Sequence, residues 1–172
     1  MILPIITYPN TILETQSKAV NFPLSIEDQD LINNMWETVN HQGVGLAAPQ
    51  VSVNKQICII NMKEDAELAK EYKIPNFVMI NPKIINFSQV QSYMIEGCLS
   101  FPAQYYFLSR PANIAVQYSN ENGKTVILKA KGWLSRIIQH EIDHLNGVLY
   151  INHPSAKRVK QEDLEAKIED SN

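Results

Sequence analysis

Three residues with the chemistry of a metal site fall within one pentapeptide, HEIDH, at residues 140–144. His140 and His144 are four residues apart, so on a helix they share one face and can bind one metal ion. Glu141 lies beside this pair and can reach a water molecule bound to the metal without being a ligand itself. The H-E-x-x-H spacing is typical of metal-dependent hydrolases, and a random chain of this size contains it less than about one time in a hundred. The pentapeptide therefore predicts a hydrolytic metal centre.

The residues around the pentapeptide predict a buried helix. Apolar side chains occupy most of its circumference, as in helices inside a core: Trp133, Leu134, Ile137, Ile138, Ile142, Leu145, Val148 and Leu149. Asn146-Gly147 predicts a left-handed cap at its end. Burying these polar side chains without partners would cost about 1–3 kcal/mol for each unsatisfied group, and a metal with its water removes that cost.

Such a site needs a third protein ligand and an open position for water. In H-E-x-x-H-x-x-G-x-x-H proteases the third ligand is a histidine, but this chain has Tyr150 at that position. His153 lies just past the helix before a proline, where surface residues are more common than ligands. Cys98, in the segment EGCLSFP, is the better candidate because a thiolate binds divalent transition metals well. A buried free cysteine is the alternative interpretation of Cys98.

The segment GVGLAAPQ, residues 43–50, has little side-chain bulk, so its backbone can approach a ligand closely. Gln50 at its end is a neutral donor, able to hydrogen-bond an oxygen that gains negative charge. A plain turn after a helix is the alternative interpretation of this segment.

Length and composition limit the class of protein. The 172 residues suit a single domain that spans residues 1–172. A net charge of −3 argues against a general binder of DNA or of membrane surfaces. Two cysteines are too few for a disulfide framework. The start lacks the pattern of a signal peptide, and no stretch approaches the ~20 apolar residues of a membrane span, so we expect a cytoplasmic protein.

Two further helices are predicted, one before and one after the central helix. Ser25 predicts the start of the first, with Asp28 in a capping role and an end near Asn40. The second, at about 155–169, is charged nearly all round and has only a thin apolar stripe.

Strands dominate the middle of the chain. Strand-like runs occupy residues 55–62, 76–86 and 90–97, with Cys58 in the core. Residues 113–119 and 125–131 predict a hairpin that turns at Asn122-Gly123. Residues 64–72 predict a short charged helix or a loop insertion.

GVGLAAPQ, EGCLS and HEIDH, in this order, resemble the three signature motifs of the peptide deformylases. The resemblance continues through Asn81-Pro82, Arg110-Pro111, Gln139 and LNGVLY, and so covers roughly residues 1–150. It implies an α+β fold with antiparallel β-sheets around the central metal-binding helix, to which the sequence adds the helix at about 155–169.

The resemblance also implies roles for individual residues. The implied metal ligands are Cys98, His140 and His144. Glu141 would be the catalytic acid and base, and Gln50 and the backbone N–H of Leu99 would hold the developing oxyanion. The Gly45 backbone would help to position the substrate. The implied metal is Fe²⁺, with Zn²⁺ or Ni²⁺ as substitutes.

The chain departs from the family in places that affect substrate contacts. Asn10 and Glu14 stand where many members carry an acidic and then a basic residue. Tyr105 or Tyr106 replaces a basic residue that often follows EGCLS-x-P. These replacements affect contacts with the substrate beyond its first side chain. Residues 63–75 resemble an insertion.

We therefore expect hydrolysis of the formyl group from N-formylmethionyl peptides. The methionine side chain would enter an apolar pocket, although core packing is an equal explanation for its walls: Val44, Met94, Trp133 and Ile137. Lys157, Lys160 and Lys167, at helical spacing, suggest a contact with ribosomal RNA.

Three alternatives stay open. A metalloprotease would need a His or Glu ligand downstream of the pentapeptide. A catalytically inactive deformylase-like binding protein would be favoured by loss of Glu141 or Gln50, and both are present. A purely structural metal site would normally need a fourth protein ligand.

Overall fold

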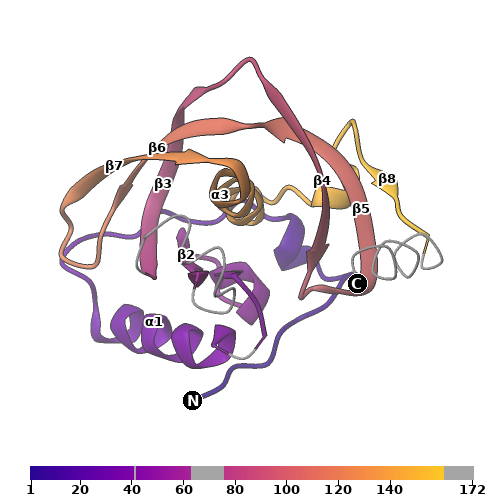
Figure 1. The fold of residues 1–172 in the computed structure, drawn as a ribbon. Coiled ribbons are helices and arrows are strands. Elements are labelled where there is room, and N and C mark those ends of the chain that lie inside the picture. The colour runs from indigo at the N-terminus through magenta and orange to yellow at the C-terminus, as the bar shows by residue number, and fades with distance from the viewer. Residues whose placement is uncertain (41, 63–75, 161–172) are drawn as a thin grey trace.

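The structure, a computed structural model, describes residues 1–40, 42–62 and 76–160. Helix α3 runs through the middle of the molecule, and strands curve around it (Figure 1). The helices and strands are α1 (Ile26–Val39), β1 (Gly45–Ala47), β2 (Ile57–Ile60), β3 (Phe77–Phe87), β4 (Gln91–Cys98), β5 (Phe101–Pro111), β6 (Asn113–Ser119), β7 (Thr125–Lys131), α3 (Gly132–Leu145) and β8 (Lys157–Arg158). Short 3-10 turns occupy η1 (Thr11–Glu14), η2 (Ala48–Val51) and η4 (Tyr150–Asn152).

The strands form two antiparallel sheets. One has the order β1-β2-β3-β6-β7 and the other the order β4-β5-β8. The chain leaves the five-stranded sheet after β3 and forms β4 and β5, which pair with each other in the other sheet. It then returns to the five-stranded sheet at β6, which pairs with β3. This arrangement confirms the predicted α+β fold of antiparallel sheets around the central helix.

Helix α3 is held on the five-stranded sheet by an apolar core. Its buried residues Leu134, Ile138 and Leu145 pack in one cluster with side chains of β2, β6 and β7. The helix ends at Leu145 with Asn146 as its C-cap, and Gly147 has a φ of +71°, as the predicted left-handed cap requires. A Cβ at Gly147 would lie 2.7 Å from the backbone of Glu14, so this glycine also allows a close approach of the N-terminal segment.

Helix α1 covers the opposite face of β2. The Ser25 hydroxyl accepts a hydrogen bond from the backbone N–H of Asp28 at 3.1 Å, which confirms the predicted cap. Ile32 and Met35 of α1 pack in a second cluster with Ile57 and Ile59. Strand β2 is therefore buried on both faces, and Cys58 lies fully inside the core, as predicted.

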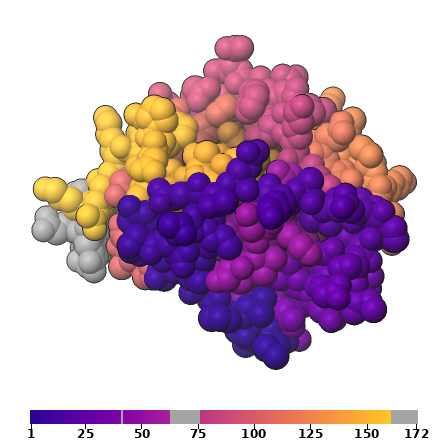
Figure 2. All heavy atoms as spheres, turned by 180° about the vertical axis from the view of Figure 1, so that it is seen from behind, coloured from indigo at the N-terminus to yellow at the C-terminus, as the bar shows by residue number. Residues whose placement is uncertain are grey.

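The N-terminal segment lies across the face seen in Figure 2, where it is coloured indigo. The backbone N–H of Ile6 donates to the carbonyl of Gln50 at 2.9 Å, and that of Tyr8 donates to the carbonyl of Ser100 at 3.0 Å. This segment thereby ties η2 to the turn between β4 and β5, which is distant from η2 in sequence.

Two parts of the secondary structure differ from the sequence analysis. Strand β5 was not predicted, and it pairs with both β4 and β8. The helix predicted at about 155–169 does not begin there, because Lys157 and Arg158 form β8 against Phe107 and Tyr106. The helical spacing assumed for Lys157 and Lys160 is therefore wrong, and the rest of that prediction, from residue 161 on, lies outside the described residues.

The element predicted at 64–72 and the insertion at 63–75 also lie outside the described residues. No helix in the described part of the chain is long and apolar enough to cross a membrane.

Candidate active site

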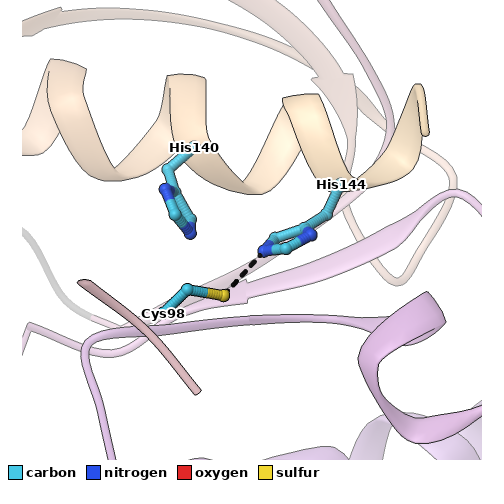
Figure 3. A group of neighbouring side chains, drawn as sticks. All are labelled: Cys98, His140 and His144. Carbon is cyan, nitrogen blue, oxygen red and sulfur yellow. Dashed lines mark hydrogen bonds between the residues drawn. The ribbon is translucent and has the colours of Figure 1, made fainter. Parts of the chain in front are cut away.

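Three side chains meet between the end of β4 and the C-terminal half of α3 (Figure 3). One ligand atom from each of Cys98, His140 and His144 lies within 4.8 Å of the other two. Sγ of Cys98 and Nε2 of His144 are 3.2 Å apart. Ligand atoms around one tetrahedral zinc-type ion are about 3.5 Å apart, so this set can close around a single ion. The structure thus brings together the three residues that the sequence analysis predicted as ligands.

An unsatisfied atom beside the cluster fits a water molecule bound to a metal. Oε2 of Glu141 is buried without a hydrogen-bond partner among the described residues. Buried polar groups are almost always paired, because an orphan costs about 1–3 kcal/mol. A thiolate and two imidazoles suit first-row divalent ions, and three protein ligands leave a position open for water next to Glu141.

Glu96 orients the first histidine. Its Oε2 lies 2.8 Å from Nδ1 of His140, on the opposite ring nitrogen from the one that a metal would use. Arg110 grips the same carboxylate through Nε at 2.7 Å and Nη2 at 3.0 Å. Nη1 of Arg136 donates to Oε1 of Glu96 at 2.9 Å, and Nη1 of Arg110 also donates to Asp143 at 2.6 Å. Two carboxylates and two guanidinium groups therefore balance their charges beneath the site.

Burial by itself raises the pKa of Glu96, but the hydrogen bonds from His140 and Arg110 outweigh it and hold this pKa well below the usual range. Glu96 is therefore an anion at every physiological pH. A fixed anion on the far side of an imidazole fixes the tautomer and makes the other nitrogen a better ligand.

Glu141 lies against β1. Its carboxylate packs on Gly45, where any Cβ would overlap Oε1 of Glu141. Burial raises the pKa of Glu141 to about 7. A carboxyl group whose pKa lies near neutrality can accept and return a proton at working pH.

Gln50 points its amide donors at the site. Its Oε1 accepts from the backbone N–H of Ala47 at 2.9 Å, so its Nε2 is directed the other way. Nε2 is 3.2 Å from Oγ of Ser100 and 3.4 Å from Sγ of Cys98. Leu99 follows Cys98 in the turn between β4 and β5, and both Leu99 and Gln50 line the same cavity.

The cavity beside the cluster has a volume of about 490 Å³. Three of the four predicted pocket residues line it: Val44, Trp133 and Ile137. Met94 does not. It lies on β4 two residues before Glu96, opposite Leu108, and an extended strand carries it roughly 7 Å farther along. The prediction of Met94 as a pocket wall was therefore wrong.

Neither downstream alternative ligand joins the cluster. Tyr150 is buried and donates its hydroxyl to the carbonyl of Gln104 at 2.7 Å, with its ring 5.4 Å from that of His140. Nδ1 of His153 lies 2.9 Å from Oγ of Ser155. In the described part of the chain, the ligand set that a metalloprotease of this type needs is absent.

The sequence analysis missed the residues that support the ligands, namely Glu96, Arg110, Arg136 and Asp143. Two signals point to them in retrospect. Glu96 precedes Cys98 by two residues on a predicted strand. Arg136 is a charged residue one helical turn before His140 in a helix that the sequence predicts to be buried.

Comparison with known proteins supports one family. The family model described as polypeptide deformylase matches residues 2–161. A peptide deformylase from Wolbachia pipientis subsp. Culex pipiens (strain wPip) is 42% identical over 158 residues, which cover 89% of this chain and 87% of that protein.

Solved structures agree with the sequence comparison. The crystal structure of peptide deformylase from Ehrlichia chaffeensis has a TM-score of 0.80 and 38% identity, and the match covers 99% of this chain and 97% of that one. The class I type b peptide deformylase from Acinetobacter baumannii with Met-Ala-Ser bound has a TM-score of 0.77 and 31% identity, over 88% of this chain and 97% of that one.

Proposed function

The chain belongs to the polypeptide deformylase family, and we propose that Cys98, His140, His144 and Glu141 carry the reaction of that family in it. The enzyme hydrolyses the formyl group from the N-terminal formylmethionine of newly made peptides and releases formate. The observation that carries the proposal is the meeting of three ligand atoms beside a buried carboxylate oxygen that has no partner.

Cys98, His140 and His144 would hold one divalent ion. Such an ion lowers the pKa of a bound water and polarises the formyl carbonyl. We propose Fe²⁺ as the ion loaded in the cell, with Zn²⁺ or Ni²⁺ as substitutes. Elemental analysis of protein purified without oxygen would test this, and stoichiometric zinc with little iron would contradict it.

Glu141 would act first as base and then as acid. Its unpartnered Oε2 takes a proton from the attacking water, and the same group later delivers that proton to the nitrogen of the leaving methionine. Burial supports both steps because it raises the pKa of Glu141 to about 7.

Gln50 and Leu99 would stabilise the oxygen that becomes negatively charged. Nε2 of Gln50 is already directed into the site by the bond that Oε1 accepts from Ala47. The backbone N–H of Leu99, next to Cys98, would be the second donor. Loss of one such donor typically slows the reaction about 100- to 1,000-fold.

The methionine side chain would occupy the apolar part of the cavity, against Val44, Trp133 and Ile137. The backbone of Gly45, at the start of β1, would help to align the peptide beside Glu141.

Formate release from formyl-Met-Ala-Ser is the decisive measurement, with acetyl-Met-Ala-Ser as the parallel substrate. The Met-Ala-Ser complex of the Acinetobacter baumannii relative supports this choice of peptide. We expect formate from the first substrate and no cleavage of the second. Cleavage of internal peptide bonds, or no formate from metal-loaded protein, would contradict the proposal.

Glu141→Gln tests the assigned base. We expect kcat to fall about 100- to 10,000-fold while the metal content stays the same, because Glu141 is not a ligand. Glu121→Gln, the same change at an exposed position in the hairpin turn, is the control and should retain full activity. Wild-type activity in metal-loaded Glu141→Gln would contradict the mechanism.

We also propose that the enzyme works in the cytoplasm and meets its substrate at the ribosome. The exposed side chains of Lys157, Arg158 and Lys160 support a contact with ribosomal RNA. Co-sedimentation with ribosomes should weaken in a Lys157→Glu, Lys160→Glu double variant, and unchanged co-sedimentation would contradict this contact.

A further inference from the structure

Part of the five-stranded sheet turns a face away from α3. On β6, Ile114 and Val116 pack in the core cluster that includes α3, so the residues that alternate with them point to the opposite face: Asn113, Ala115 and Gln117. Strands β3 and β7 pair with β6 on either side, and the three strands lie on one side of α3 (Figure 1). None of their residues lines the cavity of the candidate active site. This outer face is therefore a separate surface of the molecule.

A hollow with a volume of about 230 Å³ lies on these three strands. Ala115 faces Asn86 across one ladder and Lys129 across the other, so a small side chain stands between two larger ones. Asn113 faces Lys131 in the next row. All five residues line the hollow, which therefore has its floor at Ala115 and a polar rim.

This surface is positively charged, although the whole chain carries a net charge of −3. Strands β3, β6 and β7 contain no acidic residue, and they carry three exposed lysines, Lys83, Lys129 and Lys131. In the described part of the chain, no salt bridge involves any of the three. Lys83 faces Gln117, so it projects from the same face as the hollow. The surface therefore suits an anionic partner.

The groups around the hollow suit a phosphate backbone. Lys129 and Lys131 are two positions apart on β7, so they project from the same face roughly 7 Å apart. Neighbouring phosphates along an extended nucleic-acid strand have a similar separation. Oδ1 of Asn86 accepts the backbone N–H of Phe87 at 2.8 Å, which leaves the Nδ2 group of Asn86 to donate to a ligand. Lysine and asparagine side chains are common donors to phosphate oxygens.

Phe87 adds an aromatic ring to this surface. Its side chain is 55% exposed at the end of β3, and Phe87 lines the same hollow. Aromatic rings beside a basic groove are typical of proteins that bind single strands, because an unpaired base stacks on the ring while its phosphates pair with the cations. An acidic peptide would use the lysines but not the ring. The combination favours a single-stranded nucleic acid, and unpaired strands in a cell are mainly RNA.

We propose that the surface around this hollow binds single-stranded RNA, with phosphates at Lys129 and Lys131 and an unpaired base on Phe87. This binding goes beyond deformylation and does not depend on it, because the hollow and the cavity of the candidate active site share no lining residue. The surface also differs from the contact proposed for Lys157 and Lys160, which lie at and just after β8 of the other sheet.

Fluorescence anisotropy with a short labelled oligouridylate, on metal-loaded full-length protein at low salt, measures the binding. The Lys129→Gln, Lys131→Gln double variant should bind about 10-fold more weakly. The slope of log K against the logarithm of salt concentration should become shallower by about 1.4, because two phosphate contacts are lost. Phe87→Ala should weaken binding about 5- to 10-fold and leave that slope unchanged, since it removes a stacking surface and no charge. Ala115→Ile should also weaken binding, because the larger side chain would fill the hollow.

The matched control is the Lys18→Gln, Lys124→Gln double variant, which removes two exposed lysines that do not line the hollow. Lys124 precedes β7 and lies roughly 17 Å along the strand from Lys129. This control should bind RNA like the wild type. Every variant should release formate from formyl-Met-Ala-Ser as the wild type does, which shows that it is folded and keeps this test separate from that of the proposed function.

Three results would overturn the proposal. The first is no binding of RNA by the wild type, or equal weakening in the two double variants, which would describe a general effect of charge. The second is duplex RNA bound as tightly as the single strand, with Phe87→Ala unaffected, because the ring would then have no role. The third is binding of vesicles that contain anionic lipid without binding of RNA, which would assign the surface to a membrane.

Discussion

Nδ1 of His140 lies 2.8 Å from Oε2 of Glu96, and this contact leaves the other ring nitrogen of His140 for the cluster with Cys98 and His144. The same carboxylate receives both Arg110 and Arg136. A ligand imidazole that donates to a fixed carboxylate is held in one orientation and binds metal more strongly. The strength of the metal site therefore depends on a residue that would not touch the metal.

Glu96→Gln should weaken metal binding about 10- to 100-fold, because it removes the anion behind His140. It should also lower the free energy of unfolding by about 3–5 kcal/mol, since Arg110 and Arg136 lose a buried partner. Competition with a chelator measures the first effect, and urea unfolding measures the second. Asp143→Asn is the matched control, because Asp143 pairs with Arg110 but not with His140. If both variants bind metal equally well, Glu96 does not orient the ligand.

Gly45→Ala should slow catalysis about 100-fold, because its methyl group would occupy the space of Oε1 of Glu141 and displace the base. Metal content should not change, since no ligand is displaced. Gly43→Ala is the comparison, because the nearest atom to its new methyl would be Cδ1 of Leu99 at an ordinary 3.6 Å. The loss of kcat should be much smaller there. Equal losses in the two variants would argue against a contact specific to Glu141.

The metal-free protein should lose stability between about pH 4.5 and pH 7 through Glu141. Burial raises the pKa of this group from 4.5 in the unfolded chain to about 7 in the folded one. Between these values the folded state keeps a proton that the unfolded state has released, so the free energy of unfolding falls as the pH rises. The full difference, reached above pH 7, is about 3 kcal/mol.

Urea unfolding of chelator-treated wild type and Glu141→Gln at pH 5 to 8 measures this effect, because other titrating groups are common to both proteins. The stability of the wild type relative to the variant should decline over that range. Restoring the metal should shrink the decline, because a nearby cation favours the carboxylate. A relative stability that stays constant with pH in the metal-free proteins would contradict the assignment.

Tyr150→Phe should reduce the free energy of unfolding by about 1 kcal/mol, because the partly buried carbonyl of Gln104 loses its donor. Metal content should be unchanged, since the ring beside His140 remains. The KM for formyl-Met-Ala-Ser should rise, because residues 102–105, which line the cavity, are no longer tied to Tyr150. Tyr8→Phe removes the hydroxyl of a 44% exposed tyrosine and serves as the control. A KM that rises equally in both variants would exclude an effect through residues 102–105.

The candidate metal cluster could be predicted from sequence because each of its residues stands in a short segment with a recognisable local pattern. His140 and His144 share a helix face through their spacing alone, and Gly147 ends that helix through its backbone conformation. The hairpin of β6 and β7 and the cap of α1 at Ser25 depend on local turn chemistry in the same way.

Features that depend on pairing across the fold could not be predicted. Strand β5 lacks a regular alternation of apolar and polar residues because a bulge at residues 102–105 interrupts its pairing with β4. Arg110 is charged yet buried because it pairs with Glu96 and Asp143. Lys157 and Arg158 belong to a charged segment that favours a helix locally, but β5 offers them an open edge. The wrong placement of Met94 has the same origin, since its distance from the cavity depends on where β4 ends.

Strand β4 carries both Cys98 and Glu96, and these two residues reach the two histidines of α3. A slip of β4 by one position would turn both side chains to the opposite face at once. The pairing of β4 therefore decides both contacts together: a chain brings both Cys98 and Glu96 to the histidines of α3, or it brings neither. Recovery of tight metal binding during refolding should then work as an all-or-none reporter of correct strand alignment.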